Sequence, residues 1–144
     1  EYSRCFFTVA DVPIGIESPV NKAPLLVFDE QAKEELFEEL KKDYVSGVTF
    51  SGGDPLHLEN REEIGALAKE IREKFPDKTI WLYTGYEWEE ICHLSFLSNI
   101  DVIVDGKFKI EEKDNNLHWK GSANQRVIDV KASLRAGEVR LYQE

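Results

Sequence analysis

The sequence contains few cysteines and no methionine. Two cysteines, Cys5 and Cys92, are too few for a disulfide framework and too few for a metal cluster held by cysteine alone. Without an initiator Met, the start at Glu1 favours a processed, truncated or edited chain. No apolar run approaches the roughly 18 residues that a transmembrane helix needs, and no secretory hydrophobic segment is present. The sequence therefore argues against a disulfide-rich protein and against a transmembrane helix.

Basic residues are scarce relative to acidic ones. Asp and Glu number 28 against 18 Lys and Arg, so the formal net charge is −10. This balance argues against a general nucleic-acid binder and against a basic membrane-surface protein, because phosphates and anionic lipids repel such a charge. The length of 144 residues suits one domain, 1–144, with its own core.

Short apolar runs alternate with helical patterns along the chain. The patterns predict strands at 5–9, 45–50, 79–83, 101–104 and 127–130, and helices at 30–42, 60–75 and 87–97. Residues 110–120 have no helical period and are expected to form a loop or short arm, and the tail after residue 130 is weakly patterned. The rhythm of strand and helix is typical of an α/β protein with a parallel sheet and right-handed crossovers.

Small, polar or charged residues follow three of the predicted strands. They are Gly52, Gly53 and Asp54, then Thr84 and Gly85, then Asp105, Gly106 and Lys107. Ligands of parallel α/β folds bind beyond the carboxyl ends of strands, so we expect these endings to meet at one site. The glycines would let the backbone approach a ligand, and Asp54 could accept a hydrogen bond from an amine. A lone Gly-Gly-Asp-Pro is, however, more often a simple turn.

Asp105 and Lys107 are two residues apart, so their side chains would share one side if the strand geometry persisted. Such a pair could hold a zwitterion, with Lys107 facing a carboxylate. The alternative is a solvated salt bridge of little energetic value.

Histidine and cysteine give no catalytic pattern. His57 follows the first strand ending, but no second histidine clusters with it, and no triad spacing exists. Catalytic residues thus stay unknown. Cys92, among apolar neighbours on a predicted helix, is interpreted as a small buried hydrophobe, and Cys5 as a buried strand residue.

Four segments carry a family resemblance. They read GVTFSGGDPL at 47–56, IWLYTGY at 80–86, IDVIVDGKF at 100–108 and WKGSANQR at 119–126. In this order they closely resemble the anaerobic (class III) ribonucleoside-triphosphate reductase activating proteins, which are small radical S-adenosylmethionine enzymes. The resemblance runs from Phe28 to Val130, with Arg4 and Cys5 as a further match.

The resemblance implies a partial (β/α) barrel of the radical S-adenosylmethionine type, with flanking helices. It implies S-adenosylmethionine and a [4Fe-4S] cluster, whose reduced form cleaves the sulfonium so that a glycyl radical forms on the reductase. The implied partners are the large catalytic subunit of that reductase and a small electron donor such as flavodoxin. A cytoplasmic protein without nucleic-acid or membrane partners is implied as well.

The resemblance also implies a role for particular residues in binding S-adenosylmethionine. Gly52, Gly53 and Asp54 match the element that contacts the methionine amino group. Thr84 matches a polar strand-end residue near the cofactor, and Asp105 with Lys107 resembles a pair near the methionyl carboxylate. The late ligand-side motif is matched by Gly121, Ser122 and Asn124.

One element of the family pattern is not present. The family holds its cluster through a Cys-x3-Cys-x2-Cys loop, because three thiolates bind three irons and leave the fourth iron open. An ungapped reading from Cys5 places Val12, Ile16 and Pro19 there, and none of these ligates iron. Three explanations account for this departure: an incomplete, edited or misassigned stretch of sequence, an engineered chain without the loop, or a naturally degenerate homologue. The alternative function is a cluster-free, non-catalytic relic that binds S-adenosylmethionine or the reductase.

Overall fold

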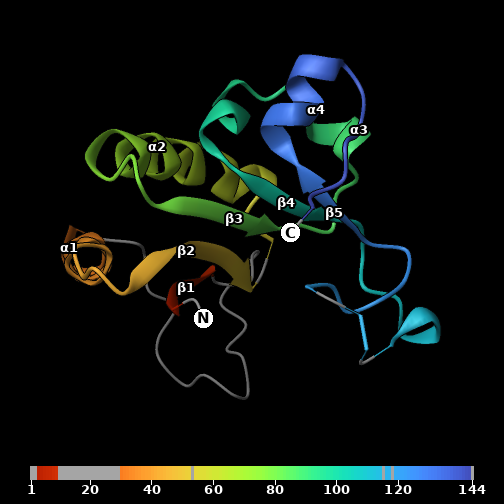
Figure 1. Ribbon diagram of the computed structural model, residues 1–144, viewed down its shortest axis with the longest axis horizontal. Coiled ribbons are helices and arrows are strands. Elements are labelled where there is room, and N and C mark those ends of the chain that lie inside the picture. The colour runs from red at the N-terminus through yellow and green to blue at the C-terminus, as the bar shows by residue number, and fades with distance from the viewer. Residues whose placement is uncertain (1–2, 10–29, 53, 115, 118, 144) are drawn as a thin grey trace.

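The computed structural model describes residues 3–9, 30–52, 54–114, 116–117 and 119–143 (Figure 1). In this part of the chain, one sheet contains β1 (Ser3–Val9), β2 (Val45–Gly52), β3 (Thr79–Tyr83), β4 (Val102–Asp105) and β5 (Arg126–Asp129). Strands that follow one another in the sequence are also neighbours in the sheet. β1 to β4 run parallel, whereas β5 is antiparallel to β4. The prediction of an α/β protein with a mainly parallel sheet is therefore confirmed.

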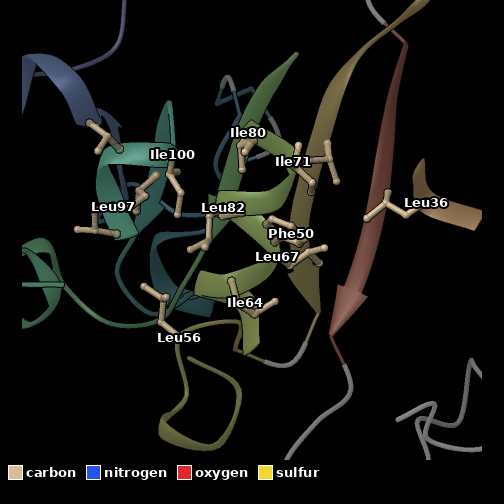
Figure 2. Close-up of a cluster of buried hydrophobic side chains, with 14 of the residues drawn as sticks. Leu36, Phe50, Leu56, Ile64, Leu67, Ile71, Ile80, Leu82, Leu97 and Ile100 are labelled. Carbon is tan, nitrogen blue, oxygen red and sulfur yellow. The ribbon is translucent and has the colours of Figure 1, made fainter. Parts of the chain in front are cut away.

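Helices pack on one face of this sheet and form its core. They are α1 (Glu30–Leu40), α2 (Leu58–Lys74), α3 (Trp88–Ile91), α4 (Val130–Ala136) and the 3-10 helix η1 (Ser95–Asn99). Phe50 of β2 and Leu82 of β3 pack with Leu67 and Ile71 of α2 in one buried cluster (Figure 2). The alternation of β-strand side chains brings these residues to the helix-covered face, and their burial supplies the main stabilising term of the fold.

The opposite face of the sheet carries an aromatic cluster. The ring of Trp81 in β3 lies 5.5 Å from that of Trp119 and 5.3 Å from that of Tyr142, each in an edge-to-face arrangement. The hydroxyl of Tyr83 donates to the carbonyl of Trp119 at 2.6 Å. Trp119 belongs to the predicted arm, which also contains the 3-10 helix η2 (Ile110–Glu112), and Tyr142 lies near the end of the chain. These contacts hold both segments against the sheet.

The predicted helix at 87–97 is wrong in its length. Helix α3 covers only Trp88–Ile91, Cys92 and His93 form a turn, and η1 follows at Ser95–Asn99. Leu94 between them is extended, with a ψ of 128°. The break lets Ile91 and Leu97 both reach the core, although they do not lie on one stripe of a continuous helix.

Helix α4 was not predicted. The Asp129 carboxylate caps it by accepting from the amide of Ala132 at 3.0 Å, and Gly137 ends it in the left-handed region with φ 74°. Both signals were available in the sequence, because Asp is a preferred N-cap and Gly a preferred helix-ending residue. The helix was missed because it has only seven residues, too few to show a clear apolar period.

Helix α2 begins at Leu58, two residues before the predicted start at residue 60. His57 occupies the N-cap position, and its Nδ1 accepts from the amide of Glu59 at 3.2 Å. Asn60 donates from its side chain to the carbonyl of Asp54 at 3.0 Å. The side chain of Cys5, which was predicted to be buried, lies outside the described residues. Across the described ranges, no helix combines the length and apolar character needed to cross a membrane.

Candidate functional site

The carboxylate of Asp54 joins the ends of β2 and β3. Its Oδ1 accepts from the hydroxyl of Thr84 at 2.7 Å and from the amide of Leu56 at 2.9 Å. Its Oδ2 accepts from the amide of Gly85 at 2.8 Å. The structure thus brings together Asp54, Thr84 and Gly85, which the sequence analysis placed at one site. Three of the roughly four acceptor positions of a carboxylate are used by the protein itself.

Lys107 approaches the same point from the loop after β4. A Cβ atom added to Gly85 would lie 3.3 Å from Asp54 Oδ2 and 3.4 Å from Lys107 Cγ. The missing side chain of Gly85 therefore permits a close approach of the endings of β2, β3 and β4. Lys107 is exposed, so its ammonium group is available to a ligand at this end of the sheet.

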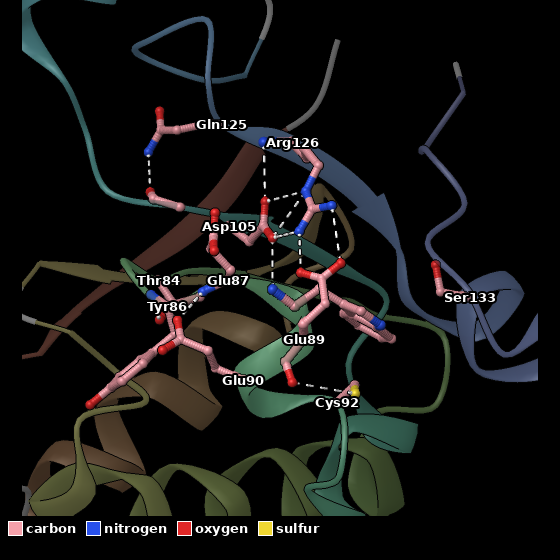
Figure 3. Close-up of polar contacts among 12 residues, drawn as sticks. Thr84, Tyr86, Glu87, Glu89, Glu90, Cys92, Asp105, Gln125, Arg126 and Ser133 are labelled. Carbon is pink, nitrogen blue, oxygen red and sulfur yellow. Dashed lines mark hydrogen bonds and ion pairs between the residues drawn. The ribbon is translucent and has the colours of Figure 1, made fainter.

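Asp105 faces a different environment from Lys107. Only 1% of Asp105 is exposed, and its Oδ2 accepts from Arg126 Nη2 at 2.6 Å and from the amide of Trp88 at 2.8 Å (Figure 3). β4 ends at Asp105, and Gly106 turns the chain with φ 93°. The strand does not continue to Lys107. The spacing of two residues therefore does not place the side chains of Asp105 and Lys107 on one side of a strand.

Arg126 connects Asp105 to helix α3. Its Nη2 also lies 2.9 Å from Glu89 Oε1, so one guanidinium bridges a buried and an exposed carboxylate (Figure 3). Hydrogen bonding to Asp105, and then to Glu89, raises the pKa of Arg126 further above its ordinary value. The hydrogen bond from Arg126 lowers the pKa of Glu89. The ion pairs hold β4, β5 and α3 in register at the ligand end of the sheet.

The segment Gly121 to Gln125 fixes the loop that carries Lys107. Ser122 is fully buried, and its hydroxyl donates to Asn124 Oδ1 at 2.6 Å and accepts from the amide of Lys109 at 3.2 Å. Asn124 Nδ2 in turn donates to the carbonyl of Lys107 at 2.8 Å. A Cβ on Gly121 would come within 3.0 Å of the Phe108 ring. The late motif therefore lies beside the loop that carries Lys107. Its Asn124 side chain contacts this loop at the backbone carbonyl of Lys107.

Sequence reasoning missed the roles of Arg126, Glu89 and Gln125. Gln125 Oε1 accepts from the amide of Gly121 at 2.9 Å, and Gln125 Nε2 donates to the carbonyl of Gly106 at 2.9 Å. The available signal was Asp105, because a carboxylate at the end of a buried strand needs a cationic or donor partner. Gly52 ends β2 directly before the Asp54 junction, and Gly53 lies outside the described residues.

The residues of the chain do not fit a [4Fe-4S] cluster. Three thiolates are needed, and the sequence has two cysteines in all. Cys92 was predicted to be buried, but it is exposed at the end of α3, because only Trp88 and Ile91 of this short helix face inward. Within the described ranges, no three His, Cys, Asp or Glu side chains are grouped so that they could hold a metal ion.

The fold and the gathered strand endings define an α/β protein with a candidate ligand site at the carboxyl end of its sheet. The family model of the 4Fe-4S single cluster domain matches residues 20–128. No solved structure gives a significant match.

Curated relatives share a single printed name, anaerobic ribonucleoside-triphosphate reductase-activating protein. The enterobacteria phage T4 protein is 45% identical over 101 residues, which cover 70% of this chain and 64% of that protein. The Haemophilus influenzae protein is 39% identical over 106 residues, covering 71% and 68%. The Escherichia coli K12 protein is 45% identical over 83 residues, covering 56% and 54%. The chain belongs to the family of anaerobic ribonucleoside-triphosphate reductase-activating proteins, and the matched region spans about two thirds or less of these relatives' length.

Proposed function

We propose that this chain takes part in activating an anaerobic ribonucleoside-triphosphate reductase by binding S-adenosylmethionine and the large catalytic subunit of the reductase. The names of its relatives support the partner. The observation that carries the ligand is the meeting of Asp54, Thr84, Gly85 and Lys107 at the carboxyl ends of three parallel strands. Ligands of parallel α/β folds bind at this edge.

The proposed architecture is a single domain, 1–144, forming a partial (β/α) barrel. Strands that are consecutive in the sequence lie side by side from β1 to β4, as the repeated right-handed β-α-β units of a barrel require. A doubly wound sheet would instead reverse its strand order at a switch point. This order supports the barrel assignment.

Within the site, the ligand's methionyl group is proposed to lie over the three strand endings. Lys107 binds the carboxylate through its ammonium group, and Asp54 offers its remaining acceptor position to the amino group. The family resemblance assigns Gly52 and Gly53 to the same contact with the amino group. Thr84 orients the Asp54 carboxylate through its hydroxyl. Among the other residues of the proposed site, Gly121, Ser122 and Asn124 position the loop of Lys107, whereas Asp105 anchors the end of β4 through Arg126.

The second candidate function is the radical chemistry that the family resemblance implies. In it, a glycyl radical forms on the reductase after reductive cleavage of S-adenosylmethionine, with electrons from a small donor such as flavodoxin. The match to a 4Fe-4S domain model favours this function. A bound cluster would supply the electron for this cleavage, and the cysteine content of the chain does not fit such a cluster. The formation of 5′-deoxyadenosine and methionine under anaerobic reducing conditions would establish this candidate.

The binding function is tested by calorimetry and by co-elution. We expect Lys107→Ala to weaken S-adenosylmethionine binding about tenfold, because a charge-assisted hydrogen bond of about 1.5 kcal/mol is lost. Lys109→Ala is the matched control, since Lys109 is an exposed lysine of the same loop. Equal losses in both variants would reject Lys107 as the carboxylate ligand. Co-elution with the reductase large subunit tests the partner separately, and its failure would reject the proposed role in activation.

A further inference from the structure

The number and placement of the cysteines disagree with the family to which the chain belongs. A [4Fe-4S] cluster with one open iron needs three thiolates, and this chain has only Cys5 and Cys92. Cys5 belongs to β1, whereas α3, which precedes Cys92, contacts β4 and β5 through Trp88 and Glu89. Three strand spacings, about 14 Å, separate β1 from β4. The backbones of the two cysteines therefore lie on elements that are separated across the sheet.

Hydrogen bonds and ion pairs within the protein link the strand endings. Asp54 links the endings of β2 and β3, and Arg126 links Asp105 to Glu89. Ser122 and Asn124 close the loop of Lys107 by hydrogen bonds. In each of these contacts the chain itself supplies both the donor and the acceptor.

Unpaired polar atoms would mark a place where a missing metal completes the structure. Among the described residues, Arg72 Nε is the one buried side-chain nitrogen or oxygen without a hydrogen-bond partner. Arg72 contacts the carbonyls of Lys78 and Asn99, which precede β3 and β4. It therefore lies at the amino end of these strands, opposite the candidate site. Among the described residues at the carboxyl end of the sheet, every buried side-chain nitrogen and oxygen has a hydrogen-bond partner.

We infer that this chain folds without an iron–sulfur cluster and that its strand-end site binds S-adenosylmethionine independently of iron. The second half of the inference rests on the proposed function, and the first half does not. Without a reduced cluster the chain supplies no electron to the sulfonium, so the bound ligand keeps its carbon–sulfur bonds. In this respect the chain differs from a family member that carries the three-cysteine loop.

The test for the first half is anaerobic incubation of the chain with ferrous iron and sulfide, followed by desalting. Protein-bound iron and sulfide, visible absorbance, and the EPR spectrum after reduction are measured. The matched control is the double variant Cys5→Ser/Cys92→Ser. We expect the wild-type chain to retain no more iron than this variant, and its thermal unfolding midpoint to be the same before and after incubation and with a chelator. Iron that the wild type retains and the variant loses, or a midpoint that rises with bound iron, would overturn the inference.

Calorimetry tests the second half on the same samples. We expect an unchanged dissociation constant for S-adenosylmethionine before incubation, after incubation and with a chelator. Binding that appears only in the iron-loaded sample would overturn iron-independent binding. Binding in none of the samples would reject the proposed ligand as well, whereas the iron and unfolding results would still decide whether the chain folds without a cluster.

Discussion

The hydroxyl of Thr84 donates to the carboxylate of Asp54, with 2.7 Å between Oγ1 and Oδ1, and so ties the carboxyl end of β3 to that of β2. These two residues are 30 positions apart in the sequence. Thr84 is buried, so water cannot readily replace this bond when one partner is removed. The pair makes the ligand end of the sheet a fixed structure before any ligand arrives.

Replacing Thr84 by Val tests this junction. The substitution keeps the shape of the side chain but removes its hydroxyl, and we expect the free energy of unfolding to fall by about 1 kcal/mol. Urea denaturation measures the loss. Asp54→Asn and the double variant complete a double-mutant cycle. The loss of stability in the double variant should differ from the sum of the two single losses by at least about 0.5 kcal/mol, because the residues are in contact. Simple additivity would show that the bond contributes no coupling.

The two carboxylates that Arg126 contacts should differ strongly in their value for stability. Asp105 is 1% exposed, whereas the side chain of Glu89 is 64% exposed. We expect Asp105→Asn to lower the free energy of unfolding by about 3 kcal/mol, since it leaves part of a buried ion pair without its partner. Glu89→Gln should change it by less than about 1 kcal/mol, because a surface ion pair contributes little. Denaturant unfolding of the two variants compares them, and similar losses would contradict the assignment of Asp105 as the buried anchor.

The ion pair between Lys33 and Glu70 predicts a pH dependence of stability. Lys33 Nζ lies 2.9 Å from Glu70 Oε1, and this hydrogen bond lowers the pKa of Glu70. A carboxyl whose pKa is lower in the folded state stabilises the fold above its unfolded pKa. That contribution is lost as the pH falls through the folded pKa.

Glu70→Gln should therefore be less stable than the wild type at neutral pH, and the difference should shrink as the solution is made acidic. Glu73→Gln, at an exposed position of the same helix, is the matched control. Unfolding curves recorded across the acidic range measure the difference. A gap that stays constant with pH would exclude a role for the Glu70 charge.

The predictability of the fold followed the strength of the hydrophobic pattern. β3 was predicted at 79–83 and occupies Thr79–Tyr83, because alternating burial along it matches a clear apolar run. α3 and η1 were merged into one helix, because apolar residues recur every three positions from Trp88 through Leu94 to Leu97, and this spacing does not reveal the break at Leu94. The antiparallel direction of β5 depends on the long arm before it, which no local pattern encodes.

The candidate site was predictable where it follows from strand topology. Asp54 and Thr84 meet because parallel neighbours end at the same edge. The separation of Asp105 from Lys107 was not predictable, since it depends on the conformation of Gly106 and on Arg126, which is distant in the sequence. Tertiary partners of this kind decide which of two nearby charged residues faces a ligand.

Gly65 in α2 gives a prediction in which helix propensity and packing oppose each other. In an exposed helix, Gly→Ala stabilises by about 1 kcal/mol. At Gly65, however, an added Cβ would lie 2.5 Å from Cδ2 and 2.8 Å from Cγ of the Phe96 ring in η1. We expect Gly65→Ala to destabilise the protein by about 1–3 kcal/mol, as overpacking of a core does.

The reverse change at exposed Ala66, Ala66→Gly, is the control for helix propensity and should cost about 1 kcal/mol. In the background of Phe96→Ala, which removes the clash, Gly65→Ala should become neutral or stabilising in denaturant unfolding. If it destabilises equally in both backgrounds, contact with Phe96 is not the reason for glycine at this position.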